Sequence, residues 1–427
     1  MRTMNRTFAT VALVALAGLM QGGTASAQLA NASSRTLGLG DNSTATAQRF
    51  EAISVNPAGL GMPGAGFSLA LLPVTARQGL GPITLKDLAD QGGQVVSPTV
   101  KEQWLSKVAA QGQQAGSVGA EVSVLALTAG RFGFQLSAIG GGSMSLAPDI
   151  VEVALYGNAG RTGSPKDLTL TGSSLDGFAV TTAGFSLGLP IPSETGAMAF
   201  GATLKYSVGH LVAVGQDQGG SLKSDPIKVN VNFPTVSVDD ENMGANQGSG
   251  IGVDVGFQIQ RDRLHFGAAV LNAFNTFAWD ESKLTYRAGL ATLEQSNNTT
   301  DFDKKPYSSA PAALKASVEE MKFDPTVSVG AAYDVQPDFT LSADVRNRFG
   351  DGMSLTPKLH AGVGAEYRGL GALHFRGGLA VVTEGMLLGG GATLVLGPVN
   401  FSFAGAVQKS DLQDVNIGQF TLSFGGR

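Results

Sequence analysis

The sequence contains no cysteine among its 427 residues. Disulfide bonds, thiol catalysis, cysteine-ligated metals and a lipid-modified N-terminal cysteine are therefore excluded. The four histidines, His210, His265, His360 and His374, are scattered and form no HExxH pattern, so we expect no metal site and no cofactor. No basic block of the kind that binds nucleic acid is present, and the formal net charge is −5.

Motifs of nucleotide binding and serine hydrolysis also lack support. Residues 59–64 match G-x-G-x-x-G, but they do not join a strand to a helix, and Pro63 removes an amide that could hold phosphate. No serine lies in G-x-S-x-G. We therefore expect a protein that is not an enzyme.

The chain also lacks a convincing transmembrane helix after its first residues. Residues 1–27 are typical of a Sec signal peptide, in which Arg2 and Arg6 precede an apolar run over 8–20 and an A-x-A cleavage site ends at Ala27. The alternative, a membrane anchor, is disfavoured because the run is shorter than the roughly 20 residues that span a bilayer. We expect a cleaved signal and localisation to the outer membrane of a Gram-negative-type bacterium.

Alternating apolar and polar residues are what the chain does contain. Only 15% of its residues are charged and 43% are hydrophobic, and the apolar ones alternate in segments of about ten, the length with which a tilted strand crosses a bilayer. Phe132 and Phe134, for example, alternate with Gln135 and Ser137. Residues 65–427 are therefore predicted to form an all-β fold, an antiparallel transmembrane β-barrel of about 14 strands. The expected strands are 66–72, 118–127, 131–140, 178–188, 198–213, 250–260, 263–273, 326–335, 338–346, 358–367, 371–381, 386–396, 398–408 and 417–424.

The connections between these strands alternate between long and short, as the extracellular loops and periplasmic turns of outer-membrane barrels do. The long ones over 215–249 and 274–325 are polar and are expected to be solvated loops, while Leu85–Asp90 and Pro98–Ala110 are expected to be helices. The last strand alternates up to Phe424 and resembles the signal read by the barrel-assembly machinery. We therefore expect that machinery and outer-membrane lipid as partners.

One face of the second loop helix is apolar. Val100, Trp104, Leu105 and Val108 follow the spacing of an amphipathic helix. This face either packs on the barrel rim or forms a hydrophobic capture surface at the barrel mouth.

The segment before the strands is predicted to plug the barrel. It extends over 28–64, contains Asn56-Pro57-Ala58, and its prolines and glycines allow at most a short helical turn near 44–50. Pro57 biases Asn56 toward an extended backbone, so that the Asn56 amide can bridge plug and wall. These three residues are the predicted plug latch.

Charged residues on the polar faces of the strands are expected to point into the lumen, because charges at membrane depth need water or a partner. They either pair with one another and with the plug, or form a polar path or a carboxylate-binding spot. The predicted lumen network comprises Asp41, Arg49, Glu51, Glu121, Lys205, Asp254, Asp344, Arg346, Glu366 and Arg376.

The Asn-Pro-Ala segment ahead of about fourteen strands, with Leu37-Gly38-Leu39-Gly40-Asp41 as its lead-in, resembles the FadL-like outer-membrane barrels. This superfamily includes hydrophobic-compound transporters and related PorV/TraF-like barrels. The amino-acid sequence of the first strand and of the helices that follow it is similar to an uncharacterised branch of the superfamily. The resemblance implies a hatch in a fourteen-stranded barrel. In the transporters it also implies a sideways exit beside a kinked third strand, which here is followed by Gly140, Gly141 and Gly142. These glycines either permit a break in pairing or mark an ordinary strand-to-loop transition.

Two functions follow as alternatives. The first is passive uptake of small hydrophobic molecules, fatty-acid-like or aromatic, through the plugged lumen. The second is a non-transport scaffold or accessory barrel that binds an unknown partner protein in secretion or surface assembly. An open porin is disfavoured by the plug. An apolar lumen pocket would favour uptake, and a lumen filled by ion pairs and the plug would favour a scaffold.

Overall fold

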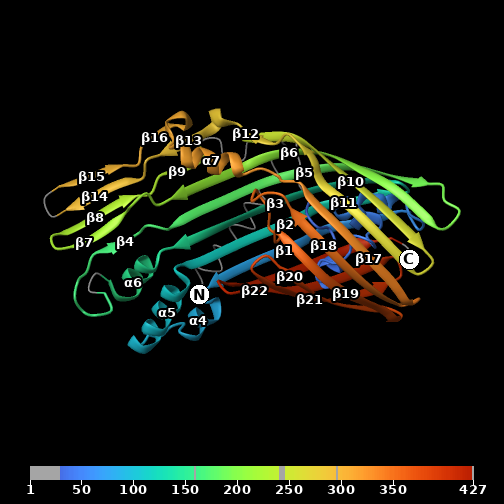
Figure 1. Cartoon of the computed structure of the whole chain (residues 1–427), viewed down its shortest axis with the longest axis horizontal. Helices are drawn as coiled ribbons and strands as arrows, with labels where there is room; N and C mark the ends of the chain where they lie inside the picture. The colour runs from blue at the N-terminus through green and yellow to red at the C-terminus, as the bar shows by residue number, and fades with distance from the viewer. Residues whose placement is uncertain (1–28, 158–159, 240–245, 295–296, 426–427) are drawn as a thin grey trace.

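The computed structural model describes residues 29–157, 160–239, 246–294 and 297–425, so the predicted signal peptide lies outside the described residues. Fourteen antiparallel strands form a closed barrel, since the first pairs with the last, Val74 opposite Phe420 (Figure 1). The barrel strands are β1 (Ser68–Gly81), β2 (Gln114–Ala129), β3 (Phe132–Leu146), β5 (Ser174–Ile191), β6 (Ala197–Gln216), β10 (Gly248–Arg261), β11 (Leu264–Asn275), β17 (Thr326–Gln336), β18 (Phe339–Arg348), β19 (Leu359–Leu370), β20 (Leu373–Val382), β21 (Gly385–Leu396), β22 (Val399–Ser410) and β23 (Asp414–Phe424). The predicted fold class is confirmed.

In the barrel wall, apolar side chains are exposed on the outer face and polar side chains are buried on the inner face, which is the reverse of a soluble protein. Phe132 and Phe185 are each 53% exposed on the outside, whereas Gln135 and Ser137 are fully buried on the inside. Strands of this kind bury polar groups in a lumen and present apolar groups to lipid. Within the described residues, no helix is both long and apolar enough to span a membrane.

The first strand is longer than the sequence predicts, because Pro73 is accommodated in a bulge. Leu72 adopts a φ of +48°, and the register with β23 shifts between Leu71 and Val74. The extra residue changes which face the following side chains occupy. Arg77 consequently points into the lumen, as Ala70 does before the bulge.

The long connections contain more regular structure than expected. The helices are α4 (Leu85–Asp90), α5 (Pro98–Gln111), α6 (Pro148–Tyr156), α7 (Ala312–Glu320), η4 (Glu281–Lys283) and η5 (Tyr307–Ser309). The strands β9 (Thr235–Val238), β12 (Ala278–Trp279), β13 (Leu284–Arg287) and β16 (Lys304–Pro306) extend the barrel sheet. A second sheet comprises β4 (Leu168–Thr169), β7 (Ser221–Ser224), β8 (Ile227–Asn232), β14 (Leu290–Glu294) and β15 (Asn298–Asp301).

The loops over 215–249 and 274–325, expected to be solvated, thus contain β-strands as well. Alternating residues such as Val229 and Val231 pair across strands once the neighbouring loop supplies a partner. The wall beneath these loops is also tall. β6 has 20 residues, about 66 Å at 3.3 Å per residue, which is longer than a bilayer is thick.

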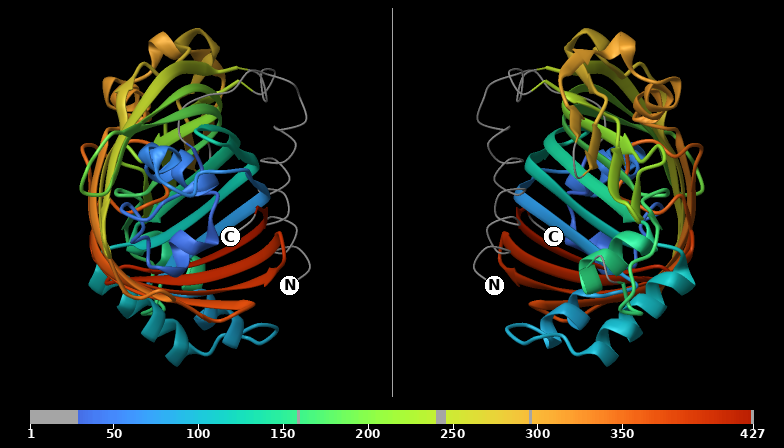
Figure 2. Two further views of the ribbon diagram at one scale, coloured as in Figure 1. Left: turned by 90° about the vertical axis from the view of Figure 1, so that its right-hand side faces the viewer. Right: turned by 90° about the vertical axis from the view of Figure 1, so that its left-hand side faces the viewer.

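The N-terminal segment lies inside the ring of strands, as both views of Figure 2 show. This hatch, residues 29–64, holds α2 (Ser34–Gly38), α3 (Arg49–Val55) and η1 (Pro57–Gly61). The expectation of one short turn near 44–50 is corrected by these elements. They are stabilised by the wall and by local caps, since Ser33 caps α2 and Asn56 caps η1.

Candidate functional site

Asn56 connects the hatch to the barrel wall. Its side-chain amide donates to the carbonyl oxygen of Thr44 in the hatch (3.0 Å) and to that of Phe257 on β10 (3.2 Å). Its Oδ1 accepts the backbone N–H of Ala58 (3.2 Å), and Pro57 follows at the start of η1. The three predicted latch residues therefore lie together at the contact between hatch and wall, and Asn56 is completely buried.

Glycines in the wall let the hatch backbone approach closely. A Cβ added at Gly201 would lie 2.1 Å from the carbonyl carbon of Pro57, and one at Gly378 would lie 2.0 Å from the carbonyl oxygen of Leu39. Real side chains do not tolerate such distances, so only glycine fits at these positions. Similar contacts occur on neighbouring strands at Gly188, Gly256, Gly267, Gly364 and Gly389.

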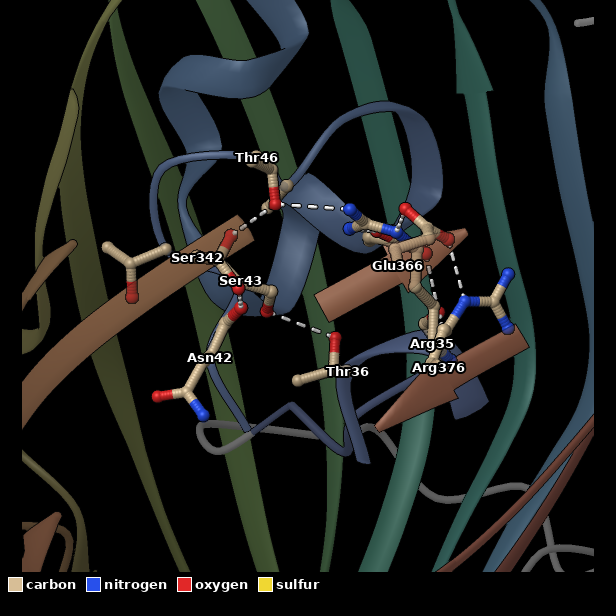
Figure 3. Close-up of polar contacts among 12 residues, drawn as sticks. Arg35, Thr36, Asn42, Ser43, Thr46, Ser342, Glu366 and Arg376 are labelled. Atoms are coloured by element: carbon tan, nitrogen blue, oxygen red, sulfur yellow. Dashed lines mark hydrogen bonds and ion pairs between the residues drawn. The ribbon is translucent and has the colours of Figure 1, made fainter. Parts of the chain in front are cut away.

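Glu366 on β19 is the centre of the strongest charge cluster (Figure 3). Its carboxylate accepts from Arg376 on the next strand (2.7 Å), from Arg368 (2.8 Å) and from Arg35 of the hatch (3.0 Å). Arg35 also pairs with Glu51 (3.1 Å). Burial alone would lower the pKa of Arg35, but Glu366 and Glu51 raise it well above its ordinary value, so this guanidinium stays charged.

Asp344 on β18 holds the middle of the hatch. Its Oδ2 accepts the backbone N–H groups of Ser43 (2.9 Å) and Thr44 (2.8 Å). Beside it, Arg346 lies 3.8 Å from Asp41 of the hatch, measured between Nη2 and Oδ2. The hatch is thus bound to this wall through polar groups.

The side chains of Asn42, Ser43 and Ser342 continue this polar contact (Figure 3). Ser342 donates to the carbonyl oxygen of Asn42 (2.8 Å), and Ser43 donates to Thr36 within the hatch (3.2 Å). Asn42 Oδ1 lies 3.1 Å from Nε2 of His360, which is fully buried on β19.

Two further pairs lie elsewhere in the lumen. Glu121 accepts from Arg77 (3.2 Å) and from the backbone N–H of Asn31 in the hatch (3.1 Å). Lys205 is 2.5 Å from Asp254, and both side chains are only 2% exposed. These charged residues form separate clusters in the lumen, and Arg49 begins α3.

Arg35, Arg77 and Arg368 complete these clusters and are not among the predicted residues. The alternation of residues did not predict Arg77, because the bulge at Leu72 changes the face of the strand on which Arg77 lies. Arg35 precedes the lead-in, and its basic charge was the only signal that the sequence offered.

A cavity of about 110 Å³ adjoins the hatch. The hatch residues Leu29, Asp41 and Val55 contribute to its lining, and Met353 and Leu355 contribute from the β18–β19 connection. Its other lining residues include both charged pairs just described. The lumen thus combines the ion-paired filling expected of a scaffold with a small chamber of mixed polarity.

The glycine run 140–142 has a different role from the one considered. β3 continues through Gly140, Gly141 and Gly142 to Leu146 and pairs there with β2 and β5 without a register shift. The idea of a break in pairing at these glycines, and that of the strand ending there, are both corrected. A Cβ at Gly141 would lie 2.4 Å from Cδ2 of Leu355, so the bare backbone makes room for that side chain.

The apolar face of α5 is not a free capture surface. Trp104, Leu105 and Val108 are buried, and Val100 packs against the same cluster as Ile83 and Val151. The helix therefore packs on α6 and the adjoining end of the barrel. This packing is favourable because apolar surface has a lower free energy when buried than when exposed to water. Among the described residues, no group of metal-ligating side chains occurs.

Comparison with known proteins supports this description. A family model described as "F plasmid transfer operon, TraF, protein" matches residues 100–345, more than half of the chain. No curated protein matches the chain by sequence.

Solved structures with the same fold include the toluene transporter TbuX of Ralstonia pickettii. It shares 14% identity with a TM-score of 0.52, and the match covers 94% of this chain and 99% of that one. The monoaromatic hydrocarbon channel CymD shares 12% identity with a TM-score of 0.51, and the match covers 93% of this chain and 98% of that one. The Pseudomonas putida toluene transporter TodX shares 12% identity with a TM-score of 0.50, and the match covers 94% of this chain and 99% of that one. The resemblance to FadL-like barrels is confirmed at the level of the fold, and these proteins are channels or transporters, not enzymes.

Proposed function

We propose that this chain, which belongs to the TraF family of F plasmid transfer operon proteins and folds as a hatched barrel, is an outer-membrane channel. Its role is the passive uptake of small hydrophobic molecules. The hatch closes the lumen at rest, and movement of the hatch opens it. Signal cleavage and outer-membrane insertion by the assembly machinery are parts of the same proposal.

The observation that carries the proposal is a chamber lined by the barrel wall and by two separate pieces of chain, the hatch and the 353–356 segment. The contact of Asn56 with Phe257 is polar and neutral, and water replaces such a contact at a net cost of about 0.5–1.5 kcal/mol. Burial of Leu37 and Ile53 favours the closed state. A hatch of this kind is closed at rest but can be displaced.

The chamber also suits an apolar molecule with a polar end. Leu29, Ile139, Leu271, Met353 and Leu355 supply apolar lining next to the charged pairs. Fatty acids and aromatic acids have this character. Toluene, which the proteins with the same fold are described as transporting, has no polar end, so those proteins support only the apolar part of the choice.

The test is to loosen the hatch from the wall side. Gly201→Val drives a side chain into Pro57, whereas Gly377→Val is a matched control because a Cβ there meets nothing within 4 Å. We expect intact cells with Gly201→Val to take up labelled octanoate several-fold faster than cells with wild type or Gly377→Val. Uptake equal to that of cells lacking the protein, in all three, would contradict the proposal.

A second candidate, a scaffold that binds a partner protein, is favoured by the ion-paired lower lumen and by the outer five-stranded sheet. Ile227 and Leu293 of this sheet are 49% and 43% exposed. This candidate predicts that Gly201→Val leaves uptake at background, and that a photo-cross-linker at Leu293 gives one discrete product with another protein in intact cells.

A further inference from the structure

The connection between β18 and β19 reaches the opposite wall of the barrel. Its residue Leu355 meets Gly119 on β2 and Gly141 on β3: a Cβ added at Gly119 would lie 2.8 Å from Cδ2 of Leu355, and one at Gly141 would overlap the same atom. Along the ring, seven strands separate this contact from the β18–β19 connection in either direction: β3, β5, β6, β10, β11, β17 and β18 one way, and β19 to β23, β1 and β2 the other. Residues 350–356, which we call the crossbar, therefore lie across the lumen.

The tip of the crossbar is seated in a notch that two glycines form. Gly119 and Gly141 lie directly opposite each other in the β2–β3 ladder, so the inner face of the wall carries no side chain at either position. Leu355 fills the space that two side chains would otherwise occupy. Glycine in a strand allows such a close approach by another part of the chain.

The base of the crossbar is held differently from its tip. Asp324 accepts the backbone N–H of Gly352 (2.8 Å). Arg348 donates to the carbonyl oxygens of Gly350 (3.3 Å) and Thr356 (2.9 Å). These hydrogen bonds fix the base, whereas the tip is a leucine side chain that is held in its notch by burial and dispersion. The tip is therefore the part that can leave its position without disturbing the rest.

Two cavities border the crossbar. Asp351 lines a cavity of about 310 Å³, together with Ser174 and Gln216, the first residue of β5 and the last of β6. This cavity thus lies at the end of the wall from which the long connections leave. Residues 353–356 line the chamber of about 110 Å³ next to the hatch. Met353, which is 2% exposed, belongs to the buried apolar cluster at this level of the lumen.

We propose that the crossbar is a second gate, on the loop side of the channel, and that Leu355 in its glycine notch is the latch of this gate. This inference rests on the proposed channel function. The chamber then lies between two gates in series, the crossbar and the hatch. A molecule reaches the chamber when Leu355 leaves the notch, which exposes one leucine side chain and leaves the strand pairing unchanged.

Substitution in the notch tests the gate in the open direction. Gly141→Ala adds a Cβ that would overlap Leu355. We expect intact cells with this variant to take up labelled octanoate several-fold faster than wild type, with no faster trypsin cleavage of the hatch. Gly116→Ala on β2 is the matched control, since a Cβ there meets only ordinary contacts of 3.4 Å or more, and it should behave as wild type. Unchanged uptake in Gly141→Ala, with the heat-dependent gel shift retained, would overturn the proposal.

A reversible disulfide tests the gate in the closed direction. Cγ of Leu355 lies 3.4 Å from a Cβ built at Gly119, so the double variant Gly119→Cys and Leu355→Cys places two thiols within reach of each other. Oxidation should lower octanoate uptake to that of cells lacking the protein, even when Gly201→Val also loosens the hatch, and reduction should restore it. Equal uptake in the oxidised and reduced forms, with the disulfide verified on a gel, would overturn the proposal.

Combining the two gates separates this inference from the channel function. Gly141→Ala together with Gly201→Val should raise uptake by about the product of the two single increases, because independent sites add in free energy. A double variant no faster than the faster single variant would overturn the second gate. If the crossbar variants change nothing while Gly201→Val still speeds uptake, the channel function stands and only the crossbar gate fails. Uptake at background in every variant would overturn both.

Discussion

Substitution of Asn56 by alanine isolates the contact between hatch and wall. The change removes two donated hydrogen bonds, to Thr44 and Phe257, and one accepted from Ala58, all from a side chain that is completely buried. Such a loss costs about 1–3 kcal/mol. The equilibrium for hatch release should therefore shift by about 5- to 150-fold toward the open state.

The barrel itself should not be affected by this substitution. Phe257 remains paired with Phe200 on β6 and with Ala268 on β11 through the backbone ladder. The variant should therefore still migrate differently on a gel before and after boiling, as closed membrane barrels do.

Limited trypsin digestion measures the release of the hatch. Cleavage after Arg35 and Arg49 should be faster in Asn56→Ala than in wild type, while Asn416→Ala, at an exposed position of β23, should behave as wild type. Equal cleavage rates for Asn56→Ala and wild type would refute the assignment of Asn56 as a latch. Loss of the heat-dependent shift would refute the claim that the latch is separate from the barrel.

Three other predictions concern the wall and the loops. Cysteine introduced at Asn298 should label from outside intact cells and cysteine at Gln336 should not; the opposite pattern would reverse the assigned sides. Glu366→Gln leaves three arginines around a neutral group and should destabilise the folded state by about 3–5 kcal/mol, whereas Asp90→Asn, which breaks an exposed pair, should cost at most about 1 kcal/mol in the same denaturation assay. Leu355→Ala removes the side chain that fills the space beside Gly141 and should increase octanoate uptake without faster hatch cleavage; unchanged uptake would show that this segment does not restrict entry.

The barrel could be predicted from the sequence because each of its strands carries its own signal. Phe132, Phe134 and Gln135 alternate between the outer face and the lumen of the barrel, whatever the rest of the chain does. The position of Asn56 could be predicted as well, since Pro57 restricts the backbone around it. These are local properties of the chain.

The remaining features depend on contacts that are distant in sequence. Gly141 accommodates Leu355, which lies more than two hundred residues later, so no local pattern distinguishes it from a glycine in a turn. Trp104 faces a helix from another loop, and a capture surface and a packed face have the same sequence spacing. The bulge at Leu72 reversed the face of Arg77 for a similar reason, because bulges depend on strand pairing.

The central claim is that the hatch closes a path through the barrel, and a reversible covalent lock tests it most directly. Ser34 in α2 and Thr421 on β23 have their side-chain oxygens 2.8 Å apart, and the chain has no cysteine of its own. The double variant Ser34→Cys and Thr421→Cys can therefore form one defined disulfide between hatch and wall.

Labelled octanoate uptake should be measured in intact cells that carry this double variant, first oxidised and then reduced. Oxidation is predicted to lower uptake to the level of cells lacking the protein, and reduction is predicted to restore it to that of wild type. Equal uptake in the oxidised and reduced forms, with the disulfide verified on a gel, would contradict the claim that hatch movement opens the channel.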